Sequence, residues 1–226
     1  MAIPRSDKQL KRQARQGMNM ERAACYLSGG RAPISLIAMT DTARLPDPES
    51  VLRRLPRGAA LIWRVYEGDA STAHLRRLTA LAHRRGVLLL IAGLPHLAAR
   101  TGIMGVHLPE REVRRPRNGA YVIPRGGYLP GMALTAACHS EIAIRLAAQA
   151  GADAVLISPV FGTKSHPGAK PLGLLRFTRL ARLATNLGLA PYALGGIVTG
   201  AHIRRLQGTG ATGVAGIGFV PARRTI

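Results

Sequence analysis

The sequence predicts an α/β fold, a single-domain (β/α)8 TIM barrel, and three observations lead to this fold class. Eight apolar runs of strand length follow one another at fairly even spacing. Most of them are continuously apolar, which is typical of parallel strands covered on both faces. Helical patterns lie between several of them, and such crossovers make the strands parallel. A doubly wound open sheet has the same alternation, but the strand count and the lack of a dinucleotide-type glycine fingerprint favour the closed barrel.

The expected strands are short apolar runs bounded by glycine, proline or polar residues. They span residues 34–39, 60–65, 87–92, 104–108, 132–138, 154–160, 191–196 and 212–218. Runs of this length suit strands better than helices. In a barrel, successive residues of each run face the interior and the surrounding helices in turn.

Four segments between the strands show the periodicity of amphipathic helices. They span residues 71–86, 140–151, 173–188 and 199–210. Gly86 and Gly151 are suited to end the first two, and Ser140 is suited to cap the second. In the first helix the expected core stripe is Leu75, Leu78 and Leu81 or Ala82. In the third helix the expected inward residues are Leu175, Leu180, Leu183 and Leu187.

The chain divides into a basic N-terminal extension, residues 1–30, and the barrel, residues 31–226. No apolar segment follows the basic start, so the extension does not read as a secretory signal; an Arg-rich transit peptide and a frayed tail or short surface helix both stay open. The segment 109–131 is rich in proline, glycine and arginine. We expect an extra loop there rather than an ordinary helix.

The composition is strongly basic, with 32 lysine and arginine residues against 11 acidic ones and a formal net charge of +21. Such a charge attracts polyanions and phosphorylated small molecules. Aromatic residues make up only 4% and the basic residues are dispersed, which argues against a nucleic-acid partner. No apolar run approaches the roughly 18 residues of a membrane span. The two cysteines form neither a metal-type spacing nor a disulfide framework, so we expect a cytoplasmic protein.

Loops after the carboxyl ends of the strands build the active site of a parallel barrel. Four candidate residues follow the sixth expected strand: Thr163, Lys164, Ser165 and His166. Hydroxyls and cations together suit a phosphorylated ligand, although an ordinary basic surface loop has the same residues. Gly196 and Gly218 follow the last two strands and let the backbone approach a ligand, as tight turns also require.

Two further candidates end earlier strands. His139 follows the fifth strand, where a histidine can carry protons near neutral pH or serve as a hydrogen-bonded structural group. Arg64 ends the second strand and suits a phosphate clamp. Cys138 precedes His139, and because neighbouring strand residues point to opposite faces, we expect no Cys–His pair.

Five separate segments, in this order, resemble the thiamine phosphate synthase and thiazole tautomerase superfamily. They are TGIMGVHLPE, ACHS, GADAVLISPVFGTKSHPGAKPLGL, ALGGI and GATGVAGIG, within residues 101–218. The superfamily fold is a (β/α)8 barrel. Its synthase couples an aminopyrimidine diphosphate to thiazole phosphate and releases pyrophosphate with the help of Mg²⁺. The resemblance implies that Thr163, Ser165, Gly196 and the Ile217–Gly218 turn contact thiazole phosphate.

The diphosphate half of the family pattern is largely missing. Of the Gln-x-Arg-x-Lys pattern on the second strand only Arg64 remains, and Ala92 and Gly93 replace an Asn–Asp pair after the third. Three other family residues differ: Glu112 stands for a metal aspartate, Ala137 for a serine and His166 for a lysine that Lys164 lies close enough to replace. Losing these groups removes most of the stabilisation of a diphosphate leaving group. No metal-ligand set is assigned, and Mg²⁺ stays open as a cofactor.

The expected function is a thiamine phosphate synthase-family barrel in thiamine biosynthesis that binds thiazole phosphate, a small phosphorylated substrate. One alternative is a metal-independent thiazole tautomerase in which His139 carries the proton, as the matching histidine does in that branch of the superfamily. Another is a barrel without catalysis that binds a phosphorylated ligand or RNA. Salt-titrated binding separates the RNA alternative from the others. The sequence does not indicate an oligomeric state.

Overall fold

The computed structural model describes most of the barrel. The described residues are 34–41, 47–64, 71–92, 101–114, 132–163, 168 and 170–217, with Ala24, Leu27 and Ala98. Almost all of the expected extension, residues 1–30, lies outside these ranges, so its division from the barrel stays a prediction. In the described part of the chain, no helix has the length and apolarity to cross a bilayer.

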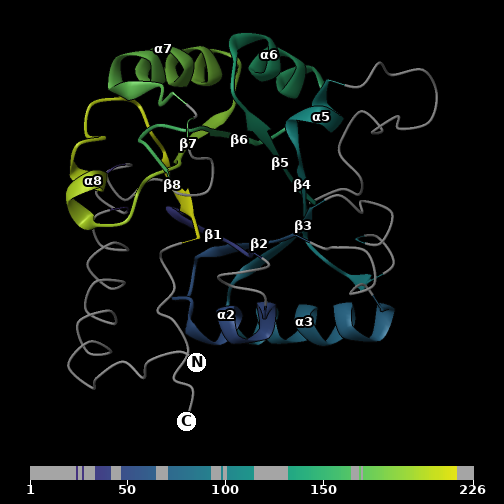
Figure 1. Ribbon diagram of the computed structural model, residues 1–226. Helices are drawn as coiled ribbons and strands as arrows, with labels where there is room; N and C mark the ends of the chain where they lie inside the picture. The colour runs from purple at the N-terminus through teal and green to yellow at the C-terminus, as the bar shows by residue number, and fades with distance from the viewer. Residues whose placement is uncertain are drawn as a thin grey trace.

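Eight parallel strands pair in chain order and close when β8 pairs with β1. They are β1 Leu36–Met39, β2 Ala60–Arg64, β3 Leu88–Ala92, β4 Gly105–Leu108, β5 Ala133–Cys138, β6 Ala154–Ile157, β7 Ala190–Leu194 and β8 Gly213–Gly216. Figure 1 shows these strands at the centre with the helices around them. The predicted (β/α)8 barrel is confirmed, and each strand overlaps its predicted run.

Helices cover the outside of the barrel. Those described are α2 Pro48–Arg54, α3 Thr72–Arg85, α5 Glu110–Val113, α6 Glu141–Gln149, α7 Gly173–Asn186 and α8 Gly200–Arg204. The Ser140 hydroxyl accepts a hydrogen bond from the Ala143 N–H (3.3 Å), which confirms the predicted cap of α6. Gly86 ends α3 in the left-handed conformation (φ +63°), as predicted. Leu75, Leu78, Leu81 and Ala82 are all buried.

The inward face predicted for α7 is partly wrong. Leu175 is 79% exposed and Leu187 is 38% exposed, whereas Leu180 is buried and Leu183 is partly buried against the core. The buried residues are Phe177, Leu180, Ala181 and Ala184. Leu180 and Ala181 are neighbours, and each lies three or four positions from Phe177 and from Ala184, so the four share one face of a helix. Leu175, five positions before Leu180, falls on the opposite side, and Leu187 lies after the last helical residue.

Two connections differ from the sequence prediction, and a third is only partly within the described residues. The predicted helix 199–210 is helical only over α8, and turns follow to residue 210. The short α5 opens the segment 109–131, of which residues 115–131 lie outside the described ranges. Helix α2 was not predicted, although Asp47 caps it by accepting a hydrogen bond from the Glu49 N–H (3.0 Å).

Alternate strand residues form two buried layers, one inside the barrel and one beneath the helices. The interior layer contains Ile37, Met39, Ala60, Ile62, Leu90, Ala92, Ala154, Leu156, Tyr192 and Ala215. Cys138 belongs to the outer layer and is fully buried. Burial, with a smaller contribution from the Glu110 charge, raises the pKa of Cys138 to about 12. The thiol therefore faces away from the interior, as the alternation predicts.

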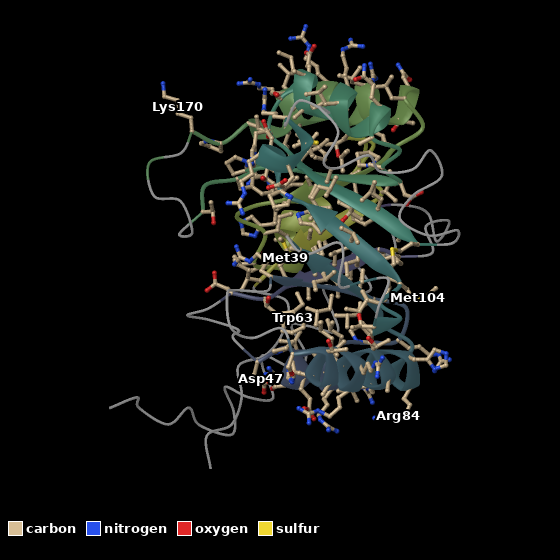
Figure 2. All side chains as sticks on the ribbon, turned by 90° about the vertical axis from the view of Figure 1, so that its right-hand side faces the viewer. Met39, Asp47, Trp63, Arg84, Met104 and Lys170 are labelled. Carbon is tan, nitrogen blue, oxygen red and sulfur yellow. The ribbon has the colours of Figure 1, made fainter. Side chains whose placement is uncertain are left out.

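The two ends of the barrel are distinguished in Figure 2. Met39, which ends β1, and Lys170, in the loop after β6, lie toward one side; Met104, which precedes β4, lies toward the other. The side with Met39 and Lys170 carries the carboxyl ends of the strands. We call it the mouth of the barrel.

Candidate functional site

Arg64, predicted as a phosphate clamp, is held by residues that follow β1. Its main-chain N–H donates to Thr40 Oγ1 (2.8 Å), its Nε to the Thr40 carbonyl oxygen (2.7 Å) and its Nη2 to Asp41 Oδ2 (3.0 Å). The side chain is 35% exposed. Asp41 therefore partly neutralises the guanidinium and fixes its direction. Thr40 and Asp41 were missed in the sequence, although both directly follow an apolar strand.

His107 forms a buried polar pair inside the barrel. Its Nδ1 lies 2.9 Å from Thr135 Oγ1, and the residue is 3% exposed. Burial lowers the pKa of His107 to about 4, and the positive charge of Arg64 acts in the same direction. His107 is therefore a neutral imidazole near pH 7. It can exchange a hydrogen bond with Thr135, but it is a poor proton acceptor.

His139 lies at the mouth, where β5 passes into α6. Its Nδ1 lies 2.8 Å from the Ser158 carbonyl oxygen and 3.2 Å from Ser158 Oγ. Because a carbonyl oxygen only accepts hydrogen bonds, we assign the proton of the neutral ring to Nδ1. The side chain is 54% exposed. Nε2 then carries the free lone pair, which is the state that a proton carrier needs.

Glu110, the first residue of α5, connects the ends of β4 and β5. Its Oε2 accepts a hydrogen bond from the His139 main-chain N–H (2.7 Å) and lies 3.8 Å from His139 Nε2. Its Oε1 accepts a hydrogen bond from Arg114 Nε (2.5 Å), and Arg114 Nη2 donates to Ser140 Oγ (2.9 Å). Both oxygens of the Glu110 carboxylate are therefore held by hydrogen bonds. The carboxylate lies next to the imidazole of His139, the proton carrier that the sequence predicts.

The loops after β6 and β7 are joined through main-chain contacts. The Val160 N–H donates to the Leu194 carbonyl oxygen (2.9 Å) and the Phe161 N–H to the Gly195 carbonyl oxygen (3.1 Å). Gly196 has φ +71°, and a Cβ there would lie 2.5 Å from the Gly162 carbonyl oxygen. The close approach at this glycine is therefore made by the chain's own β6 loop.

Phe161 attaches the β6 loop to the last helical connection. Its ring packs edge-on against His202 of α8, with 5.4 Å between the ring centroids. The Arg205 guanidinium lies over the same ring, 4.9 Å from its centroid. A cation over an aromatic face is an attractive contact. The α8 connection, far from Phe161 in the sequence, thus holds the loop that leads into Thr163.

The predicted phosphate contacts are only partly within the described residues. Thr163 is partly buried and directly follows Gly162. Ile217 is partly buried after β8 and packs against both core layers. Because β7 and β8 are neighbours, Gly196 and Ile217 follow adjacent strands. Four further predicted residues lie outside the described ranges: Lys164, Ser165, His166 and Gly218.

The resemblance implies a Mg²⁺ site, but the donors in the part of the chain that the structure describes do not fit one. Within the described ranges, no three His, Cys, Asp or Glu side chains gather closely enough to hold a metal ion. Ala92 at the end of β3 offers no side-chain ligand, whereas Mg²⁺ needs oxygen atoms. Asp41 and Glu110 are already paired with Arg64 and Arg114. These two carboxylates are therefore poorly placed to serve a metal.

In comparisons with known proteins, the barrel is similar to thiamine-phosphate synthases. A family model described as thiamine monophosphate synthase matches residues 36–220. A putative thiamine-phosphate synthase 2 from Aquifex aeolicus is 32% identical over 188 residues, which is 80% of this chain and 95% of the relative. A thiamine-phosphate synthase from Thermus thermophilus is 34% identical over 60% of this chain and 61% of its own length.

Solved structures show the same fold. Thiamine phosphate pyrophosphorylase from Pyrococcus furiosus matches with a TM-score of 0.61 and 22% identity, over 81% of this chain and 85% of that protein. Deoxyribose phosphate aldolase from Aeropyrum pernix matches with a TM-score of 0.57 and 18% identity, over 96% and 97% of the two chains. At such identities the likeness concerns the fold alone. The family match and the Aquifex relative, which both cover most of the barrel, show that this chain belongs to the thiamine monophosphate synthase family.

Proposed function

We propose that this protein, whose family gives it a role in thiamine biosynthesis, binds thiazole phosphate at the barrel mouth and transfers a proton at the thiazole ring without a metal. The observation that carries the proposal is His139, whose Nδ1 is engaged by the Ser158 carbonyl oxygen at 2.8 Å while its ring is half exposed. A fixed tautomer presents Nε2 as the base. We expect this activity in the cytoplasm.

The phosphate would bind where the loops after β6, β7 and β8 meet. Thr163 follows the loop that presses against Gly196, and Ile217 follows the strand next to it. The phosphate contacts that we propose are Thr163, Lys164, Ser165, His166, Gly196, Ile217 and Gly218. Main-chain amides with hydroxyls and cations are the groups that hold a dianion. We keep Arg64 as a further contact through the part of its guanidinium that Thr40 and Asp41 leave exposed.

The proton transfer would be reversible and balanced. Nε2 of His139 accepts a proton from a C–H of one thiazole tautomer, and the bonding pair moves into the ring π system. The imidazolium then returns a proton at a second ring position, which gives the other tautomer and restores the neutral histidine. Nothing is consumed, so the residues at hand suffice.

The second candidate is the coupling reaction that gives the family its name. The match over residues 36–220 and the synthase relatives favour it. It requires the aminopyrimidine diphosphate to be held and its leaving group to be neutralised. Asp41 already partly neutralises Arg64, and within the described residues the carboxylates do not gather into a set that fits Mg²⁺. We therefore rank it second.

Calorimetry combined with an assay for released pyrophosphate separates the two candidates. Thiazole phosphate is titrated into the protein in EDTA, and then in the presence of aminopyrimidine diphosphate with Mg²⁺. We expect saturable binding of thiazole phosphate in EDTA and no release of pyrophosphate in either case. Pyrophosphate release at rates typical of enzymes, roughly 1 s⁻¹ or more, would instead establish the coupling reaction. RNA binding that falls steeply with salt, without saturation by thiazole phosphate, would favour a polyanion-binding barrel.

A further inference from the structure

Glu110 belongs to no part of the proposed chemistry, yet it contacts the residue that carries it. We propose that Glu110 is a positioning residue for His139, fixing the end of β5 and stabilising the imidazolium that forms when Nε2 accepts a proton. The inference rests on the proposed function, because it assigns a partner to the same proton carrier.

The first part of the role concerns the main chain. Oε2 of Glu110 accepts the His139 N–H at 2.7 Å, and the Glu110 side chain is only 14% exposed. A hydrogen bond to an ionised acceptor is stronger than a neutral one, especially where water is partly excluded. This bond fixes the residue that directly follows β5. The position of the imidazole over the mouth therefore depends on a side chain from the neighbouring strand.

The second part concerns the ring. Nδ1 is held by the Ser158 carbonyl oxygen (2.8 Å), so the ring rotation is limited and Nε2 points away from Ser158. Glu110 Oε2 lies 3.8 Å from Nε2. That distance is within the range of an ion pair but too long for a hydrogen bond in the neutral state. The carboxylate therefore lies close enough to attract a charged ring, without occupying the lone pair that must accept the proton.

Arg114 sets the direction of the carboxylate. It binds Oε1 at 2.5 Å and donates to Ser140 Oγ, which in turn caps α6. With Oε1 directed to Arg114, Oε2 is the oxygen left for His139. Because Arg114 also moderates the negative charge, we expect Glu110 to contribute less than an isolated buried carboxylate. We expect removal of the Glu110 charge to lower the rate of proton transfer by about tenfold to a hundredfold, as for other groups that orient a reactive partner.

The test compares three variants of the full chain. Glu110→Gln keeps an oxygen that can accept the His139 N–H but removes the charge, and Glu110→Ala removes both. Glu49→Gln is the matched control, since Glu49 makes the same i,i+4 pair with Arg53 (2.6 Å) on α2. Circular dichroism and thermal unfolding check that each variant is folded.

The spectroscopic measurement needs no turnover. In protein labelled with ¹⁵N-histidine, the His139 signals are identified by their loss in His139→Ala. We expect the neutral ring to be the Nδ1–H tautomer, and the His139 amide proton to shift upfield in Glu110→Gln, more in Glu110→Ala and not in Glu49→Gln. A ring protonated mainly on Nε2, or an amide signal that is the same in Glu110→Ala and the unchanged protein, would overturn the inference.

The kinetic measurement follows the interconversion of the thiazole phosphate tautomers in EDTA. We expect kcat to fall in Glu110→Gln and further in Glu110→Ala with KM nearly unchanged, because the oxygens of Glu110 are occupied by protein groups. Equal kcat values in Glu110→Ala and Glu49→Gln would contradict the role. If even the unchanged protein shows no turnover, the proposed function fails, and the spectroscopic result still decides whether Glu110 positions His139.

Discussion

The buried His107 makes the stability of the barrel depend on pH. Its folded-state pKa is about 4, against 6.5 for the free side chain, because burial and then the nearby Arg64 disfavour the charged ring. Between these two values the unfolded chain binds a proton that the folded chain does not. Stability from this group is therefore fully present above pH 6.5 and is lost as the pH falls toward 4. Below that, both states are protonated and the loss levels off.

The magnitude follows from the separation of the two pKa values. At about 1.4 kcal/mol per pKa unit, a fall from 6.5 to about 4 corresponds to about 3 kcal/mol. Typical domains unfold with roughly 5–15 kcal/mol. Titration of this one histidine can thus remove a large share of the stability of a typical domain.

The assay is urea unfolding at pH 4, 5, 6 and 7 for the unchanged protein, His107→Gln and the exposed-site control His83→Gln. Gln can still form a hydrogen bond with Thr135 but does not titrate. When the free energies of unfolding of two proteins are subtracted at each pH, the contribution of the carboxylates that both contain cancels. We expect the stability gap between the unchanged protein and His107→Gln to shrink by about 3 kcal/mol from pH 7 to pH 4. The gap to His83→Gln should show no such change. A gap to His107→Gln that is constant over this range would show that burial does not lower the pKa of His107.

Two further predictions concern the loops and the thiol. Gly196→Ala should destabilise the protein by about 1–3 kcal/mol more than Gly188→Ala in urea unfolding. Both glycines have positive φ, but only a Cβ at residue 196 would meet a main-chain oxygen, so equal losses of stability would disprove the loop contact. In a Cys25→Ser variant, Cys138 should not react with a thiol reagent at pH 8 until the protein is unfolded, because burial raises the pKa of Cys138 to about 12. Fast reaction of this thiol in the folded protein would contradict the prediction.

The strands were predictable because most of them are continuous apolar runs. A run such as 87–92 is covered on both faces in a closed parallel sheet, so its pattern depends little on details of packing. The caps Ser140 and Gly86 were predictable for a similar reason, because their effect is local. Helix α2 could have been found from Asp47 followed by proline at the first turn.

The face of α7 and the contacts of the mouth were not predictable in the same way. Leucine is common on both faces of α7, so the positions of the leucines alone wrongly placed Leu175 on the buried face. That face also contains the small residues Ala181 and Ala184. The pairs Arg64–Asp41 and Glu110–His139 join residues 23 and 29 positions apart, and their contact depends on which strands are neighbours. The sequence indicates the residues that end the strands, but not which of them neutralise one another.

The proposed metal-free proton transfer by His139 is tested by the rate at which thiazole phosphate tautomers interconvert in EDTA. The rate is compared for the unchanged protein, His139→Ala and His83→Ala. We expect turnover in EDTA, a loss of about a hundredfold or more in His139→Ala, as for removal of a general base, and an unchanged rate in His83→Ala. A rate in His139→Ala equal to that of the unchanged protein would show that His139 is not the proton carrier.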